Sequence, residues 1–439
     1  MYPSHSATPK PPYRKLVSVR RISLVKPLDS NETHEVVMVD GWPVVVEKGQ
    51  FAAGQQVLYF AIDCVLPLYD ERYEPYRFSQ LCVKLHGKKG WVVQTVKHQG
   101  HISQGMVFRI DDTFPEIMRV KKEIDDWYNT RKLDEKGKLK RAEEDLHDLD
   151  FKDDLKIRKW ITFYPVDGGI SLGRPPRFLP TTKSERLQNI PGLWKTYRDT
   201  EFEITEILDG IPMVFYDVSE YCREEVCYDD LPGVTWDGAL NGRVILDNNM
   251  IPRKHFGISS GDHDYEETEA SVSWKAMRDQ DIVGNFVNAV GNVGLAGVLC
   301  GEGISDNPHM LEGRHFYTFS ACDDDFRAYK PLDEYWWCKY YSDSSVPRVP
   351  RFTQRVRLSA FAKDMDELMR KAQGETCESG RSGKKRDPYL KRKGLVFRAL
   401  DGSFSFKVIA NDWLLDETEK LREAGKDKIV CRPGPNDCV

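Results

Sequence analysis

Glu206-Ile207-Leu208-Asp209-Gly210 lies inside a β-rich run that extends from Phe202 to Tyr216. Asp-Gly is a tight-turn signal, so this run predicts two strands that meet at Asp209-Gly210. Because side chains alternate along a strand, Thr205 and Ile207 are expected to face the same side. Any chemistry on that side must therefore accommodate a branched alkyl group at position 207.

The composition indicates a folded protein of two or three domains. The chain has 439 residues, of which 40% are hydrophobic and 11% aromatic, enough for each domain to bury a core. The net charge of −5 excludes a global field that would draw the molecule onto nucleic acid, so such binding requires local basic patches.

The ten cysteines are scattered, with no Cys-x-x-Cys pair. This spacing is typical of free thiols in a reducing compartment rather than of zinc sites or disulfides. The first residues lack an apolar signal segment, and no apolar run reaches transmembrane length. We therefore expect a cytoplasmic or nuclear protein with no membrane contact.

Short strands separated by glycine-containing turns fill the first hundred residues, as in a small closed barrel. A helical spacing of apolar residues follows, and then a highly charged segment from 131 to 154, typical of a solvated helix or linker. The expected strands are Leu16–Val19, Glu35–Val39, Val44–Glu47, Val57–Ile62, Trp91–Val96 and Met106–Ile110, and the helical spacing is that of Ile117, Val120, Ile124 and Trp127.

These patterns predict a domain order. We expect a flexible N-terminus (1–12), an OB-type β-barrel (13–115), a charged helical linker (116–159), an α+β domain (160–416) with a basic loop insertion at 374–393, and a C-terminal tail (417–439). Near the end of the α+β domain, the Asp401-Gly402 turn predicts a hairpin of 394–400 with 403–410. In its second strand Lys407 lies on the face opposite Phe406 and Val408.

Ordered motifs along nearly the whole chain resemble a family of ATP-dependent RNA ligases that carry an OB-type domain ahead of a nucleotidyltransferase domain. The motifs are Arg14-Lys15-Leu16, Val39-Asp40-Gly41-Trp42, Phe60-Ala61-Ile62-Asp63, Leu66-Pro67, Gly100-His101-Ile102-Ser103-Gln104-Gly105, Pro180-Thr181-Thr182, Glu185–Asn189, Leu208-Asp209-Gly210, His255–Ser260, Gly301-Glu302-Gly303-Ile304, Phe316–Phe319, Gly394–Arg398 and Ser405–Ile409. The resemblance implies an α+β fold in which an ATP-grasp-like or ligase-type domain of antiparallel sheets with helices follows the barrel. It also implies ATP as the nucleotide and Mg²⁺ as the cofactor of an active enzyme.

At four motif positions the chain departs from what this family's chemistry needs. Ile207 stands where a lysine amine should attack the α-phosphorus of ATP. Gly261 replaces an arginine, and Val298 replaces a glutamate. Lys393 replaces a glutamate that helps to hold the metal, and an ammonium group repels a cation. These departures predict that the chain does not adenylylate itself.

Other motif positions are retained. The resemblance implies nucleotide binding by Glu206, Asp209, Gly210, Phe319 and Lys407. Simpler interpretations remain open: Asp209 and Gly210 suit a turn, with a positive φ at the glycine, and Phe319 suits a core. Candidate RNA contacts are His98, Gln99 and His101 in the barrel and Lys384, Lys385 and Arg386 in the basic loop.

Three hypotheses follow. The first is a catalytically inactive RNA-ligase-like monomer that binds RNA or a nicked duplex, or a protein partner. The second is an active RNA ligase whose nucleophile is displaced to Lys183 or Lys195. The third is a nucleotide-sensing regulatory partner that holds ATP through Phe319 and Lys407 without reacting.

Overall fold

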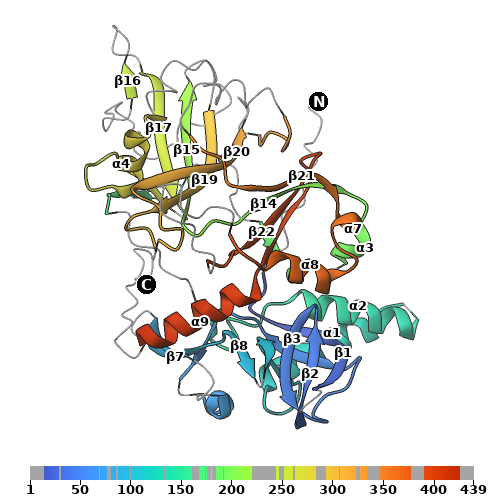
Figure 1. Ribbon diagram of the computed structural model, residues 1–439. Helices are drawn as coiled ribbons and strands as arrows, with labels where there is room; N and C mark the ends of the chain where they lie inside the picture. The colour runs from blue at the N-terminus through green and yellow to red at the C-terminus, as the bar shows by residue number, and fades with distance from the viewer. Residues whose placement is uncertain are drawn as a thin grey trace. The chain divides into compact units, whose positions relative to one another are not determined.

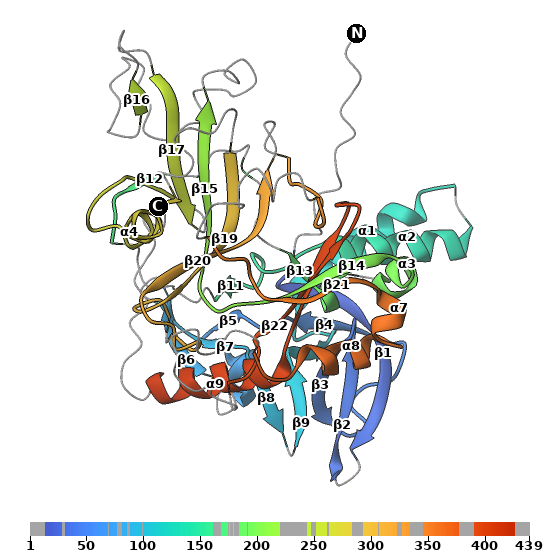
Figure 2. The same ribbon diagram turned by 45° about the horizontal axis from the view of Figure 1, so that its top comes forward.

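The computed structural model divides the chain into two compact units (Figure 1, Figure 2). Unit 1 contains 1–162, 188–191 and 411–439, and unit 2 contains 163–187 and 192–410. The structure describes residues 14–425 except 29–30, 69, 77–80, 86–87, 99, 133, 161–167, 174, 176–178, 180–183, 191, 220–243, 247–251, 261–262, 283–292, 306, 323–326, 334–345 and 377–389.

Unit 1 is built on short antiparallel strands, as the sequence predicts. One sheet has the order β10-β4-β1-β2-β3, a second has the order β11-β5-β7-β6, and β8 pairs with β9. The strands are β1 (Val17–Leu28), β2 (Asn31–Val39), β3 (Trp42–Glu47), β4 (Gln56–Phe60), β5 (Cys64–Pro67), β6 (Leu81–Leu85), β7 (Lys88–Val92), β8 (Thr95–His98), β9 (His101–Gln104), β10 (Met106–Arg109) and β11 (Arg158–Lys159), with a 3₁₀ helix at Glu71–Tyr76.

One strand prediction is wrong. The segment Trp91–Val96 does not form a single strand, because β7 ends at Val92 and β8 begins at Thr95. The chain changes partners between them: Val92 pairs with β5 and β6, whereas Thr95 pairs with Gln104 of β9. Apolar alternation predicts an extended backbone, but it does not predict which neighbour the backbone bonds.

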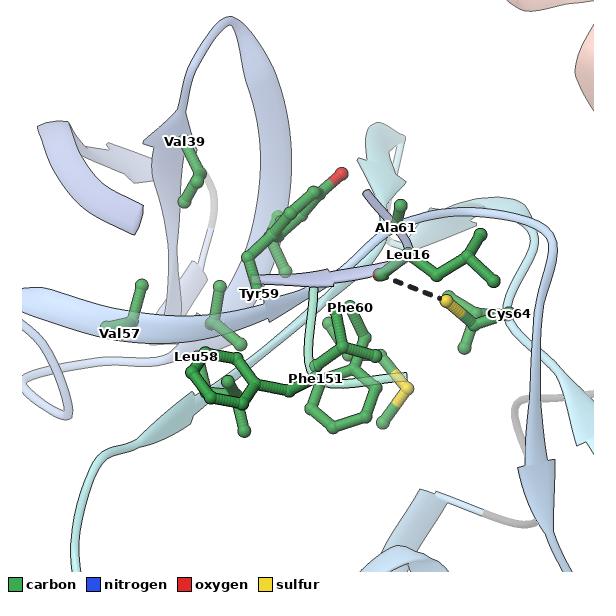
Figure 3. Close-up of a cluster of buried hydrophobic side chains, with 14 of the residues drawn as sticks. Leu16, Val39, Val57, Leu58, Tyr59, Phe60, Ala61, Cys64 and Phe151 are labelled. Atoms are coloured by element: carbon green, nitrogen blue, oxygen red, sulfur yellow. Dashed lines mark hydrogen bonds between the residues drawn. The ribbon is translucent and has the colours of Figure 1, made fainter. Parts of the chain in front are cut away.

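Apolar residues of the barrel strands form one continuous core (Figure 3). Val57, Leu58 and Phe60 of β4 are fully buried. Cys64 belongs to this cluster and is fully buried, and its thiol donates a hydrogen bond to the carbonyl oxygen of Leu16 at 3.2 Å. Burial raises the pKa of the Cys64 thiol, so this cysteine remains protonated and packs as a small apolar group.

Two helices from the segment predicted as a linker, α1 (Pro115–Asn129) and α2 (Glu135–Asp148), belong to unit 1. Ile117 is buried in the barrel core, and Val120 and Ile124 pack against it. After α2, the carboxylate of Asp150 accepts the backbone N–H groups of Leu16 and Val17 at 3.3 and 3.1 Å. The charged segment is therefore attached to β1.

The C-terminal helix α9 (Asn411–Gly425) also belongs to unit 1. It crosses the boundary that the sequence analysis set at 416. The side chain of Gln104 donates to Asn411 Oδ1 at 3.1 Å, and Thr418 Oγ1 donates to the carbonyl oxygen of Thr95 at 2.9 Å. Both bonds join the helix to the β8–β9 hairpin.

Unit 2 contains two sheets with helices beside them, which confirms the α+β prediction. A seven-stranded sheet has the order β12-β18-β17-β15-β19-β20, with β16 also paired to β17, and a five-stranded sheet has the order β13-β23-β22-β14-β21. The elements are β12 (Ser171–Gly173), β13 (Glu185–Arg186), β14 (Glu201–Glu206), β15 (Ile211–Ser219), β16 (Val244–Leu246), β17 (Pro252–Ser260), β18 (His263–Tyr265), β19 (Val293–Gly301), β20 (Arg314–Cys322), β21 (Arg351–Arg357), β22 (Gly394–Ala399), β23 (Ser405–Ile409), α3 (Leu193–Tyr197), α4 (Val272–Asp279), α7 (Leu358–Phe361) and α8 (Met365–Ala372). A 3₁₀ turn at Leu187–Asn189, which begins in unit 2 and ends in unit 1, precedes α3.

Candidate functional site

Asp209-Gly210 is not a hairpin turn, which corrects the sequence prediction. β14 belongs to the five-stranded sheet and β15 to the seven-stranded sheet, so Ile207–Gly210 carries the chain from one sheet to the other. Gly210 also does not adopt a positive φ. A Cβ atom at Gly210 would lie 2.2 Å from the carbonyl oxygen of Leu299, so glycine is needed here because the backbones approach closely.

Ile207 continues the pairing of β14 with β22 beyond the end of the strand. Its backbone N–H donates to the carbonyl oxygen of Gly394 at 2.9 Å. Its Cδ1 atom lies 3.1 Å from the position that a Cβ on Gly394 would occupy. The alkyl side chain therefore packs directly over the first residue of β22.

The residue before β22, Lys393, forms an ion pair with Asp209. The Lys393 ammonium group donates to Asp209 Oδ1, and the two side chains are only 20% and 13% exposed. A largely dry environment strengthens this attraction relative to a surface pair. Two charged positions from separate motifs thus neutralise one another.

His309 completes this arrangement, and the sequence analysis did not identify it. Its Nε2 atom accepts the backbone N–H of Asp209 at 3.0 Å, and the residue is only 1% exposed. The pKa of His309 is lowered to about 4, mainly by burial; the Asp209 carboxylate raises it and the Lys393 ammonium group lowers it by smaller amounts. The imidazole is therefore neutral at neutral pH, as an acceptor must be. A single histidine outside any motif gives no sequence signal for this role.

These residues do not fit a divalent metal ion. A cation beside the Asp209 carboxylate would face the Lys393 ammonium group that already bonds it, and like charges repel at this range. Within the part of the chain that the structure describes, no three His, Cys, Asp or Glu side chains are grouped as metal ligands. We therefore derive no chemical step through a metal at this position.

The five-stranded sheet has one aromatic face. Phe397 and Phe406 stack with ring centroids 4.6 Å apart, and Phe202 meets Phe406 edge-on at 5.5 Å. All three side chains are fully buried. They fix the register of β14, β22 and β23, because a one-residue slip would turn them onto the opposite face.

The opposite face of this sheet carries polar and basic side chains. Strand pairing aligns Thr205, Val396, Lys407 and Arg186 in one row across four strands. A second row contains Glu203, Arg398 and Ser405. The predicted hairpin of β22 with β23 is confirmed, and Lys407 lies on this polar face. Glu206 instead pairs with Leu395, so its side chain lies on the aromatic face of the sheet. Glu206 is buried.

Arg398 is a second residue that the sequence analysis did not single out. Its Nη1 atom donates to Thr205 Oγ1 at 3.1 Å, and its guanidinium carbon lies 5.0 Å from the ring centroid of Phe319. Burial lowers the pKa of Arg398, while Glu203 raises it. Phe319 is half-buried and packs against the apolar cluster that contains Val298. Its ring therefore contacts both this cluster and the Arg398 guanidinium group.

Glu203 is the buried acid of this face. It is fully buried, and its Oε1 atom accepts from Arg351 Nε at 2.9 Å and lies 3.4 Å from an Arg348 guanidinium nitrogen. Because its charge is paired with these arginines, it does not cancel Lys407 or Arg186. The alternation of β14 could have indicated Glu203, since it lies two residues before Thr205.

The remaining site residues predicted from the sequence lie in several parts of the chain. Val298 is 5% exposed and packs with Leu208 and Tyr317, so an acid there would be buried among apolar groups. Lys195 is exposed on α3. Gln99, Lys183, Gly261, Lys384, Lys385 and Arg386 lie outside the described residues.

The two barrel histidines lie in unit 1. His98 pairs with His101 across the β8–β9 hairpin, and its ring centroid is 4.7 Å from that of His34. Burial lowers the pKa of His98, and the neighbouring His34 lowers it further. The His98 ring can therefore stack or accept a hydrogen bond at neutral pH without carrying a charge.

The chain is similar to an OB-fold domain model and to solved structures of an RNA ligase. A family model described as an OB-fold domain matches residues 16–110. A Naegleria gruberi RNA ligase variant with AMP and Mn is 27% identical, with a TM-score of 0.69, over 93% of this chain and 100% of that chain. Another variant of that ligase, with ATP and Mn, is 26% identical, with a TM-score of 0.69 and the same coverage of both chains.

A third structure, Naegleria gruberi RNA ligase with PPi, is 26% identical, with a TM-score of 0.68, over 94% of this chain and 100% of that chain. No curated protein matches the chain significantly. None of the helices among the described residues is both long and apolar enough to cross a membrane.

Proposed function

We propose that this chain, which belongs to an ATP-dependent RNA ligase-like family, binds RNA and does not form a lysine–AMP intermediate. The observation that carries the proposal is the pair of replacements at one point of unit 2. Ile207 packs over Gly394, and Lys393, the residue before that glycine, is ion-paired with Asp209. An alkyl group offers no lone pair for attack on phosphorus, so covalent nucleotide transfer lacks its nucleophile.

Residue spacing supports this alignment of the motifs. The solved Naegleria gruberi structures include variants of a lysine and an aspartate that are two positions apart in that ligase. Ile207 and Asp209 have the same spacing here. Other variants alter a glutamate and a lysine 14 positions apart, which is the spacing of Lys393 and Lys407. The matching intervals favour Lys393, not a neighbour, as the counterpart of the glutamate.

The polar face of the five-stranded sheet supports binding to a polyanion. Lys407 and Arg186 lie next to one another across β23 and β13, and Arg398 lies on the same face. The only acid in these two rows, Glu203, is held by Arg351 and Arg348. Basic side chains of this kind bind phosphate groups, and Arg and Lys contacts to phosphates make RNA affinity salt-dependent.

Equilibrium binding tests the proposal. We expect the full chain to bind a short fluorescein-labelled nicked RNA duplex, measured by anisotropy, with affinity that falls as salt rises from about 50 to 200 mM. Lys407→Ala should reduce the salt slope by about one. Lys363→Ala, at an exposed lysine of the same unit, is the control and should leave the slope unchanged. Absence of binding at the lowest salt would refute the RNA-binding part of the proposal.

A nucleotide-sensing role is the second candidate, and the contact of Phe319 with Arg398 favours it. An aromatic ring beside basic side chains suits a nucleotide base and its phosphates. If ATP binds here without reacting, millimolar ATP should raise the melting temperature of the chain, and Phe319→Ala should abolish the rise. An unchanged melting temperature in the parent chain would remove this candidate.

A further inference from the structure

The α1–α2 hairpin of unit 1 is segregated by charge. Residues 127–141 contain six Lys or Arg and two Asp or Glu, a net charge of +4, whereas 143–154 contain seven Asp or Glu and one Lys, a net charge of −6. A helix that only needs solvation mixes charges of both signs along its length. We call residues 127–141 the basic tip.

The acidic part of the hairpin is used to attach it to the barrel. Glu143 accepts a hydrogen bond from Arg21 Nε at 2.9 Å, and Asp148 pairs with Lys15 at 3.1 Å. Asp150 bonds the backbone of β1. These contacts give three of the seven acidic side chains a structural role at the barrel. The basic side chains lie toward the N-terminal end of α2.

Most cations of the basic tip are exposed. Lys138 and Lys140 lie near Glu135 and Glu144. Among the described residues, no carboxylate forms an ion pair with Arg131, Lys132, Lys136 or Arg141, and all four are exposed. Figure 2 shows α1 and α2 side by side.

Trp127 is the second, independent feature of the basic tip. It continues the apolar spacing of Ile117, Val120 and Ile124, yet its side chain is 57% exposed. The Arg131 guanidinium carbon lies 3.9 Å from its ring centroid, which fixes the indole by a cation–π contact. An exposed indole beside unpaired cations is the combination that stacks on a nucleobase while the cations bind the adjoining phosphates.

We propose that the basic tip is an RNA-binding surface, in which Trp127 stacks on an unpaired or terminal base and Arg131, Lys132 and Lys136 contact the backbone. The inference rests on the RNA binding proposed above and adds a site that no ligase motif contains. Charge complementarity favours RNA as the occupant, because the tip is strongly positive on a chain whose net charge is −5.

The test measures the affinity of the full-length chain for a fluorescein-labelled nicked RNA duplex with a short single-stranded overhang. Trp127→Ala should weaken binding about fivefold or more, and Trp127→Phe should keep most of the affinity, because a phenyl ring still stacks. The double variant Lys132→Gln with Lys136→Gln should lower the salt slope by about two. The matched control is Arg119→Gln with Lys122→Gln at the other end of α1, which should leave the slope unchanged.

The outcomes separate the two proposals. If the parent chain binds RNA and the tip variants bind as it does, or if the control pair has the same effect as the tip pair, the basic tip is not the RNA surface although RNA binding stands. If the parent chain binds no RNA, both proposals fail. Each altered side chain is exposed, so unchanged melting temperatures will show that any loss of binding is not a folding defect.

Discussion

Asp209 forms hydrogen bonds through both its side chain and its backbone at the candidate site, and these bonds bring Lys393 and His309 together. The carboxylate is bonded by Lys393, and the backbone N–H is bonded by His309. A positive charge so close to His309 opposes its protonation. Lys393 therefore affects a histidine that no motif includes, as well as the charge of Asp209 between β14 and β15.

The titration of His309 predicts acid sensitivity. Its pKa of about 4 in the folded chain lies below the ordinary 6.5, so the unfolded chain binds more protons between these values. The stabilisation is complete above about pH 6.5 and is lost as the pH falls toward 4. In urea unfolding, the parent chain should lose about 2 kcal/mol more between about pH 7 and pH 5 than His309→Gln does. Equal losses of unfolding free energy in both proteins would contradict a neutral His309 in the folded chain.

The local sequence pattern predicted which segments form strands better than it predicted which strands pair with one another. The β22–β23 hairpin was predictable because both strands and the turn are adjacent in sequence, with apolar residues on alternate positions. Asp209-Gly210 has the same turn signal, but β14 and β15 pair with strands far away in sequence. Likewise the motif resemblance drew attention to Lys393, whereas Arg398 and His309 are recognised only from their contacts with residues far away in sequence.

A substitution of Gly394, at the start of β22, tests how tightly β22 packs against β23. Its φ is +155°, and a Cβ there would lie 2.2 Å from the carbonyl oxygen of Val408. Gly394→Ala should lower the free energy of unfolding by about 3 kcal/mol, through backbone strain and displacement of β23. Gly313→Ala is the control, because its φ is +69° with no atom within 4 Å, and it should cost about 1 kcal/mol. Similar costs, measured by chemical unfolding, would argue against a tight β22–β23 contact.

At the scale of the whole molecule, the two units are not two consecutive halves of the sequence. The last described helix, α9, belongs with the first strands in unit 1, and unit 2 is formed by residues between them. Sequence composition could not predict this, because α9 has an ordinary amphipathic pattern. Hydrogen bonds of Asn411 and Thr418 attach α9 to the β8–β9 hairpin.

Removing those bonds should loosen the hairpin locally. Asn411→Leu with Thr418→Val deletes the two hydrogen bonds to the hairpin, each worth about 1 kcal/mol, together with a bond from Thr418 to the carbonyl of Leu414 within α9. Hydrogen exchange should then lose about 1–2 kcal/mol of protection in residues 95–104, with β14 and β22 unchanged. Thr130→Val, which removes a bond to the carbonyl of Trp127 within α1, is the control. An equal loss of protection throughout the chain would show that these hydrogen bonds do not stabilise the hairpin locally.

Incubation of the full-length chain with α-³²P-labelled ATP, in Mg²⁺ or Mn²⁺, tests the proposed loss of nucleotidyl transfer most directly. We expect no covalent AMP in the parent chain, because position 207 is an isoleucine. Ile207→Lys alone should also remain unlabelled, because the Lys393 ammonium group opposes a cation, and adding Lys393→Glu to that variant should allow labelling. A stable AMP adduct on any lysine of the parent chain, including Lys183 or Lys195, would contradict the account.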